Sequence, residues 1–279
     1  MSTYINPESA LAREFWEKGK LESCPIYDFH GHMHEMFGGW LPAGEPEQML
    51  DTMNRAGIKS FCFSSHLALY CVEAGETANL EPVRRFGNPL HAYLGVQAFA
   101  PNAERDIAAL EANRSAYVGC KFLCDYHKVA LEDESLAAYW EYLNDNHLLA
   151  LCHTWGGSRF NGPDNIRSIA QRYPNVTIIM GHSCHSRWDQ AIQLVKDFPN
   201  VYFELTAVLD DRGILDRFVR ECGSERILFG TDLPWFSTHH AIGCICDAEM
   251  TDEDRHNIFH RNGERIMADL NARGWGTGA

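Results

Sequence analysis

The sequence predicts an α/β fold, a TIM-like (β/α)8 barrel with a metal site at the carboxyl-terminal ends of its strands. Short β-rich runs alternate with amphipathic helical patterns along the whole chain. The chain has 279 residues, a length that suits one barrel domain over 1–279. Five apolar runs end in residues that can bind a metal. A barrel of parallel strands gathers its functional residues at such strand ends.

An open doubly wound sheet is the alternative arrangement of the same elements. It seldom brings residues from the first and last strands into one site, because those strands need not be neighbours. Eight strand–helix units close most naturally into a barrel. The chain also contains no Ser/Gly linker or charge block that would mark a second domain.

The elements follow in order from a leading helical pattern over 7–20. Strands are predicted by apolar, β-branched and aromatic runs at 25–29, 58–63, 90–99, 116–122, 148–152, 176–180, 201–205 and 227–229. Between them, apolar residues at helical spacing predict helices at 46–57, 102–113, 134–146, 189–197 and 211–222. Thr251 can cap a last helix whose first residues are acidic. The tail, from about 273 to 279, is expected to be flexible.

Composition excludes several classes of protein. Hydrophobic residues make up 45% and charged residues 22% of the chain, as in ordinary soluble domains. The net charge of −14 argues against nucleic acid or an anionic membrane as a partner, because both require a basic face. No signal peptide or apolar run of about 20 residues is visible. We therefore expect a cytoplasmic protein with a small-molecule substrate, and a homo-oligomer stays open.

The ten cysteines do not predict a disulfide framework. Cys62, Cys120 and Cys152 lie inside strand-like apolar runs, where free cysteine behaves as a small buried hydrophobic residue. No closely spaced cysteine pair has a second matching pair, so a zinc-knuckle or redox role is not expected.

Histidines and an aspartate end the strand-like runs. His30 and His32 are one residue apart, so on a strand both side chains leave the same face. His153, His182 and Asp232 end later strands, and each alone could be a hydrogen-bonded core residue or a helix cap. Together they indicate a site for a divalent ion, most suitably zinc, with manganese as an alternative.

Lys121 ends the fourth strand and faces the same mouth. An ammonium group that points at a divalent cation is repelled, so this lysine must be neutral, carboxylated or displaced. The alternative is an ordinary lysine that binds a substrate carboxylate or pairs with Asp125.

These strand-end motifs resemble those of the amidohydrolase superfamily. The segments that carry the resemblance are Asp28-Phe-His-Gly-His32, Gly119-Cys-Lys121, Leu151-Cys-His153-Thr, Met180-Gly-His182 and Ile227-Leu-Phe-Gly-Thr-Asp232-Leu-Pro. The likeness is greatest to the amidohydrolase-2 branch, whose metal-dependent hydrolases are related to aminocarboxymuconate-semialdehyde decarboxylase, and it spans about Tyr27 to Met267.

The resemblance implies a ligand set at the barrel mouth. His30, His32, His153 and Asp232 would hold a first ion, and His182 would bind a second ion or touch the reactive water. In two-metal members a carboxylated lysine on the fourth strand bridges the ions, and Lys121 stands at that place. Other members carry a lysine there and use one ion, so the choice between one and two ions stays open.

Loops after the strands should line the substrate pocket. Aromatic residues beside arginine suit a planar or carboxylate-bearing substrate. On this basis we expect substrate contacts from His127, Trp155, Arg187 and Trp235. For each of them the alternative is an ordinary polar rim.

The leading functional hypothesis is metal-dependent hydrolysis of an amide, lactone or ester, with Asp232 as general base and His182 as a second catalytic residue. The alternative is a metal-dependent decarboxylase that acts on an aromatic or unsaturated carboxylate. The lack of long insertions and the presence of Lys121 favour hydrolysis. A third reading, a non-enzymatic metal- or ligand-binding barrel, is disfavoured by a ligand set that includes a base.

Overall fold

The strands form a single parallel sheet that wraps into a barrel. The computed structural model describes residues 6–36 and 39–278, and its strands are hydrogen-bonded in the order β1 to β8. Their bounds are Ile26–Met33, Ile58–Ser65, Leu90–Val96, Tyr117–Phe122, Leu149–Trp155, Thr177–His185, Val201–Glu204 and Ile227–Leu228. The predicted (β/α)8 barrel is confirmed, and each predicted strand overlaps one observed strand, although β1 and β6 extend further and β3 ends earlier than predicted.

The barrel closes between β1 and the residues that follow β8. The amide of Phe29 donates to the carbonyl of Phe229, 2.9 Å away, and the amide of His32 donates to Leu233, 2.7 Å away. The amide of Asp232 in turn donates to the carbonyl of His30. These bonds place the segment after β8 directly beside the end of β1. Candidate ligands from the two ends of the chain, His30 and Asp232, can therefore share one site.

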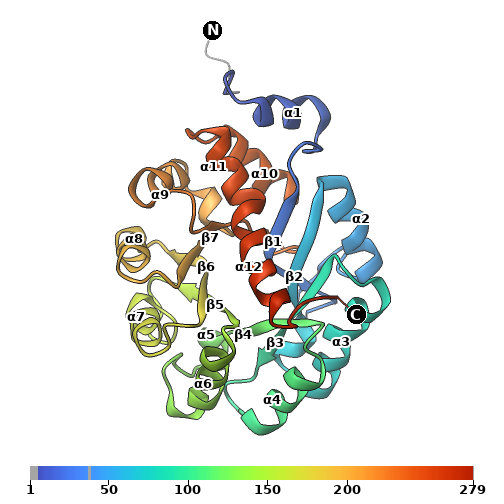
Figure 1. Ribbon diagram of the computed structural model, residues 1–279, viewed down its shortest axis with the longest axis vertical. Coiled ribbons are helices and arrows are strands. Elements are labelled where there is room, and N and C mark those ends of the chain that lie inside the picture. The colour runs from blue at the N-terminus through green and yellow to red at the C-terminus, as the bar shows by residue number, and fades with distance from the viewer. Residues whose placement is uncertain (1–5, 37–38, 279) are drawn as a thin grey trace.

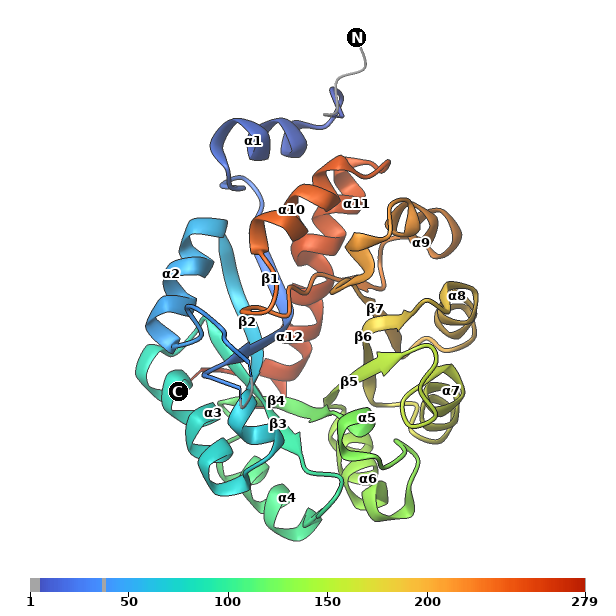
Figure 2. The ribbon, with the colours of Figure 1, turned by 180° about the vertical axis from the view of Figure 1, so that it is seen from behind.

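Helices surround the strands on the outside (Figures 1 and 2). They are α1 Ala10–Lys18, α2 Pro46–Ala56, α3 Val72–Phe86, α4 Ala103–Ala112, α5 Cys124–His127, α6 Ala137–Asn146, α7 Pro163–Arg172, α8 Trp188–Asp197, α9 Ile214–Cys222, α10 Thr238–Asp247, α11 Asp252–His256 and α12 Asn262–Ala272. Short 3₁₀ turns lie at His66–Leu69 (η1), Glu134–Leu136 (η2) and Val208–Asp210 (η3). A turn of π-helix, η4 at Asn257–Arg261, joins α11 to α12. Among the described helices, none is long and apolar enough to cross a membrane.

The helix that begins at Thr251 has the predicted cap. The hydroxyl of Thr251 accepts from the amide of Asp254, and the Asp254 carboxylate accepts from the amide of Thr251. This reciprocal pair satisfies amides that lack partners at a helix start. Asp252 then receives the amide of Ala10, 2.8 Å away, so it ties α1 to α11.

The predicted tail packs against the barrel as far as residue 278, and residue 279 lies outside the described residues. Trp275 is only 1% exposed, and the guanidinium of Arg114 lies 4.8 Å from the centre of its ring. The amides of Gly276 and Gly278 donate to the carbonyls of Arg114 and Ser115, each at 2.9 Å. Burial of one indole removes a large apolar area from water, enough to hold a short glycine-rich segment in place.

Candidate active site

The carboxyl ends of four strands and the segment after β8 bring the predicted metal ligands together. His30 and His32 lie on β1, Lys121 on β4, His153 on β5 and His182 on β6. Asp232 follows β8, and donor atoms of His30, His182 and Asp232 all lie within 4.8 Å of one another. Figure 2 shows the loops and short turns that surround the mouth of the barrel.

The hydrogen bonds of the two β1 histidines set their tautomers. The Nδ1 of His30 lies 2.8 Å from the Oε2 of Glu204, and the Nδ1 of His32 lies 2.9 Å from the carbonyl of Ser64. Neither a carboxylate nor a carbonyl can donate, so each Nδ1 carries the proton. Each Nε2 therefore presents a lone pair to the mouth, which is the arrangement found in metal-binding histidines.

Asp232 faces both of these lone pairs. Its Oδ1 lies 3.1 Å from the Nε2 of His32 and 3.4 Å from that of His30. An unprotonated Nε2 cannot donate, so neither contact is a hydrogen bond, and within the described residues this buried oxygen has no hydrogen-bond partner. A carboxylate oxygen and two imidazole lone pairs around one point fit a divalent cation.

The histidines of β5 and β6 complete one wall. The Nδ1 of His182 lies 3.3 Å from the carbonyl of Thr206, and its Nε2 lies 3.1 Å from the Nδ1 of His153. Burial, reinforced by the nearby His30, lowers the pKa of His182 to about 4. Burial and the nearby His182 also hold the pKa of His153 well below its ordinary value. Both imidazoles are therefore neutral near pH 7, as metal ligands must be.

Glu204, at the end of β7, holds this wall in place, and sequence reasoning assigned it no role. It is fully buried, and its Oε2 accepts from the ring of His30 and from the amide of His182 at 3.0 Å. Its Oε1 accepts from the amide of Thr206 at 2.6 Å and from the Thr206 hydroxyl at 2.5 Å. Burial alone raises the pKa of such a carboxyl group, but His30 and these donors keep it lowered. A single acidic residue inside the apolar run Val201–Glu204 was the available signal, because buried charges are almost always paired.

Lys121 points into the mouth from β4 and is fully buried. Its Nζ lies 2.7 Å from the Nε2 of His30, so in this state it occupies the lone pair that a metal would use. Burial lowers the pKa of Lys121 to about 8, although Asp232 and Glu204 oppose the shift. An appreciable share of the amine is therefore neutral near pH 7.

The backbone is strained at two ligand positions. His182, Ser183 and Cys184 have φ values of 67°, 48° and 52°, and Asp232 has a φ of 54°. Non-glycine residues rarely adopt this left-handed conformation, which costs on the order of 1 kcal/mol or more. Residues strained in this way are found most often at functional sites. The amide of Cys184 is held by the hydroxyl of Thr154, 2.8 Å away.

Two of the predicted substrate contacts lie at the mouth. Trp155 is 39% exposed, and its ring stands 5.7 Å from that of His182. Trp235 is 44% exposed, and its indole nitrogen donates to the Nε2 of His66, 2.9 Å away. The His66 ring stacks on that of His32 at 4.6 Å, so it links the exposed indole to a candidate ligand.

The other two predicted contacts have different surroundings. The Nε2 of His127 lies 2.8 Å from the carbonyl of Leu69, and its Nδ1 accepts from the amide of Ala98 at 3.3 Å. Both nitrogens are thus used by the backbone, which suits a role in joining loops rather than in binding substrate. Arg187 is exposed and caps the start of α8, and among the described residues its guanidinium has no ion-pair partner.

Solved structures with this fold include both hydrolase-type and decarboxylase proteins. An uncharacterised TIM-barrel protein from Bordetella bronchiseptica is 15% identical, with a TM-score of 0.71, over 88% of this chain and 99% of its own. An amidohydrolase from Burkholderia multivorans is 12% identical, with a TM-score of 0.70, over 87% and 99%. The 5-carboxyvanillate decarboxylase from Sphingomonas paucimobilis is 12% identical, with a TM-score of 0.65, over 88% and 99%. At such identities the likeness shows the fold alone.

Comparison of sequences is more specific about the family. No curated protein matches the chain. The family model described as amidohydrolase matches residues 27–267. This range contains all six strand-end residues and all eight strands, apart from the first residue of β1. The chain therefore belongs to the amidohydrolase family, as its strand-end motifs predicted, and is an enzyme of that superfamily.

Proposed function

We propose that this protein is a metal-dependent hydrolase that cleaves an amide, lactone or ester bond in a small organic substrate. The observation that carries the proposal is the Oδ1 of Asp232, buried between two imidazole lone pairs and, within the described residues, without a hydrogen bond. A protein rarely leaves a carboxylate oxygen in this condition unless a cation completes the site.

The donor set suits zinc, with manganese as the alternative. His30, His32, His153 and Asp232 would hold one ion, and His182 would hold a second or contact the reacting groups. A divalent ion in this place lowers the pKa of a water molecule towards about 7 and polarises the carbonyl under attack.

The chain supplies the proton transfers. The pKa of Asp232 lies well below the ordinary value although burial opposes this shift, so the group is an ionised carboxylate. Its side chain is 13% exposed, so the mouth gives a substrate access to it. In the proposed reaction it takes the proton of the attacking water and passes it to the leaving group. His182 is neutral and would contact the oxygen of the scissile carbonyl.

Trp155 and Trp235 would form apolar walls for the organic part of the substrate, and Arg187 would bind a carboxylate on it. The exposure of both indoles beside candidate ligands supports this assignment. His127 is left out of the proposed pocket because its nitrogens bond to the backbone.

Lys121 determines the number of ions. Its neutral amine can attack carbon dioxide, lose a proton to solvent and become a carbamate anion. The lowered pKa of Lys121 supports this reaction, because only the unprotonated amine is a nucleophile. The modification would replace a cation beside His30 by an anion and so would favour two ions in the mouth.

A decarboxylase is the second candidate. It is favoured by the same barrel in 5-carboxyvanillate decarboxylase, and it would use one ion and no carboxylated lysine. In that reaction the bond from the substrate carbon to its carboxylate breaks, carbon dioxide leaves, and a proton takes its place. The same mouth and the same Asp232 would serve both chemistries.

The two candidates are separated by a substrate panel. The zinc- or manganese-loaded enzyme is offered amides, lactones and esters beside aromatic carboxylates, in water enriched in heavy oxygen. Hydrolysis predicts products that gain one labelled oxygen, and Asp232→Asn should suppress their formation. Release of carbon dioxide without label in the remaining product would favour the decarboxylase and overturn the hydrolase proposal.

A further inference from the structure

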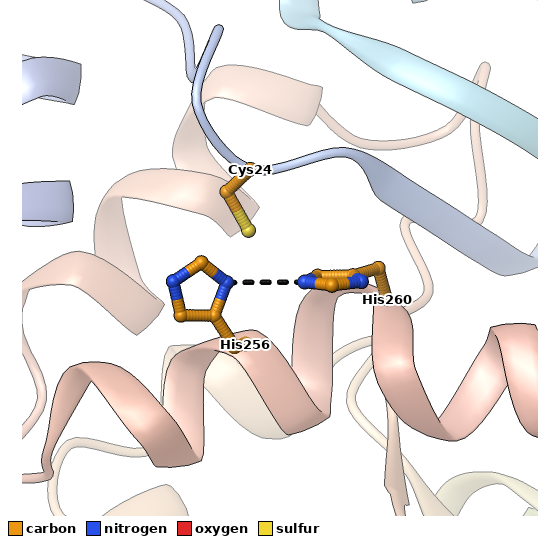
Figure 3. Close-up of side chains that lie close together, drawn as sticks. All are labelled: Cys24, His256 and His260. Atoms are coloured by element: carbon orange, nitrogen blue, oxygen red, sulfur yellow. Dashed lines mark hydrogen bonds between the residues drawn. The ribbon is translucent and has the colours of Figure 1, made fainter.

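Three metal-binding side chains meet far from the mouth. Cys24 lies in the segment between α1 and β1, His256 ends α11, and His260 lies in the π-helical turn η4. One donor atom from each lies within 4.8 Å of the other two. Figure 3 shows the sulfur of Cys24 directed towards the two imidazole rings, which are joined by a hydrogen bond between one nitrogen of each.

This cluster is at the opposite end of the barrel from the active site. Cys24 precedes the first residue of β1, Ile26, whereas His30 and His32 lie towards the end of that strand. Six residues of extended chain between Cys24 and His30 span roughly 20 Å. One ion therefore cannot serve both clusters, and metal bound here would be independent of catalysis.

The two histidines already have nearly the spacing of ligands on one ion. The Nδ1 of His256 lies 3.0 Å from the Nε2 of His260, so a single proton is shared between two ring nitrogens. Two nitrogens on a tetrahedral zinc ion, each about 2.0–2.1 Å from it, stand roughly 3.4 Å apart. Replacement of the shared proton by an ion needs a movement of only a few tenths of an ångström.

The far nitrogen of His260 has a carboxylate beside it. Its Nδ1 is buried and, among the described residues, makes no hydrogen bond, although the Oε1 of Glu264 lies 3.1 Å away. A small rotation of the ring or of the glutamate would let Nδ1 donate to that oxygen. Metal-binding histidines are usually oriented by such a bond from the second nitrogen.

The helix is irregular at this point. The amide of Asn262 donates to the carbonyl of Asn257, five residues earlier, instead of four as in an α-helix. Single π-helical turns are rare overall, and many of those that occur lie at functional sites. The irregular turn contains His260 and begins directly after His256, which places both histidines beside Cys24.

We propose that Cys24, His256 and His260 form a second metal site that binds zinc or a similar thiophilic divalent ion. One thiolate and two imidazoles suit zinc, with water in the fourth position. The Cys24 thiol loses its proton to solvent as the sulfur–metal bond forms. Burial raises the pKa of Cys24 to about 12, so the ion itself must drive this deprotonation.

The site would act as a structural clamp. Cys24 belongs to the start of the chain and both histidines to its end, and the ion would join the segment before β1 to the helices after β8. The amino-terminal face of a (β/α)8 barrel is the face associated with stability rather than catalysis. Metal bound only to the folded state raises stability by mass action.

Cobalt(II) is the probe that distinguishes this site from the mouth. A cobalt–thiolate bond gives a charge-transfer band in the near ultraviolet, and the candidate ligands of the mouth include no cysteine. The wild-type protein, titrated with cobalt(II), should develop the band to an intensity at saturation of about one cobalt–thiolate site per chain. The band should vanish in Cys24→Ser and in His260→Gln, and it should persist in the control Cys222→Ser, which changes a half-buried cysteine elsewhere.

A second readout guards against a variant that fails to fold. Zinc added to the metal-free protein should raise Tm more in His30→Ala/His32→Ala than in the same protein that also carries Cys24→Ser. Loss of that difference, an absent band in the wild type, or a band that survives Cys24→Ser would each overturn the proposal. None of these results depends on the reaction catalysed at the mouth.

Discussion

Glu204→Gln is the substitution that tests most sharply how the active site is held. The exchange keeps the shape of the side chain and removes one acceptor oxygen. In the folded protein the Oε2 accepts hydrogen bonds from the ring of His30 and the amide of His182. The Oε1 accepts hydrogen bonds from the amide and the hydroxyl of Thr206. An amide nitrogen cannot accept, so one pair of donors must face it.

The cost follows from the orientation that the new amide adopts. If its oxygen faces His30 and His182, the Thr206 hydroxyl can turn and accept, and only the amide of Thr206 loses its partner. One buried donor without a partner costs about 1–3 kcal/mol. The opposite orientation leaves both His30 and His182 unpaired and costs about twice as much. The first orientation should prevail. Because a neutral amide oxygen accepts from His30 less strongly than a carboxylate does, metal binding should weaken about 10–100-fold.

The assay combines a competition titration with a chelating dye and urea unfolding of the metal-free protein. Ser183→Ala is the matched control, because Ser183 is buried and bonds to the backbone of Glu204 but not to its carboxylate. The control should lose stability and keep its metal affinity. Wild-type metal affinity and unchanged unfolding in Glu204→Gln would refute the assigned role of this carboxylate.

Three further substitutions test neighbouring parts of the site. Asp232→Asn should leave the barrel folded by circular dichroism and lower kcat by roughly 100-fold or more, since a general base is worth that much; near-normal turnover would remove Asp232 from the mechanism. Lys121→Ala, in a Cys24→Ser background, should reduce the ion count by elemental analysis from two to one per chain, with partial rescue by a short added carboxylate. One ion in both proteins would rule out the two-ion mouth. Gly230→Ala should weaken metal binding about as much as Glu204→Gln, because a Cβ there would lie 2.0 Å from the Oε1 of Glu204 and 2.9 Å from the Cβ of His30. Wild-type metal affinity in this variant would show that Glu204 and His30 can move without loss of the site.

The strands and the ligands were predictable because their signals are local. Each strand is a short apolar run, and the candidate ligands lie at or just after the carboxyl ends of five of these runs. The helix α3 was not predicted, since Gly75 and Pro82 weaken its helical pattern. Gly75 is needed there because a Cβ would lie 2.2 Å from the Cα of Ala68. This close contact between Gly75 and Ala68 exists only in the folded structure, so the spacing of apolar residues in the sequence does not predict it.

Other features depend on residues that only the fold brings together. The glycine-rich tail looked flexible, but Trp275 reaches a place beside Arg114 and is buried. The role of Glu204 depends on its contact with His30, which lies 174 residues earlier in the sequence. Cys24 gave no sign of a ligand because its partners lie at the other end of the chain.

The central claim is that the mouth binds a divalent ion through the β1 histidines. It is tested most directly by elemental analysis of protein purified without chelator, with Cys24→Ser as the parent and His30→Ala/His32→Ala added to it. The account predicts at least one tightly held zinc or manganese ion per chain in the parent and none in the triple variant, with both proteins folded. Equal metal content in the two proteins, or a metal-free parent that does not take up zinc on reconstitution, would contradict it.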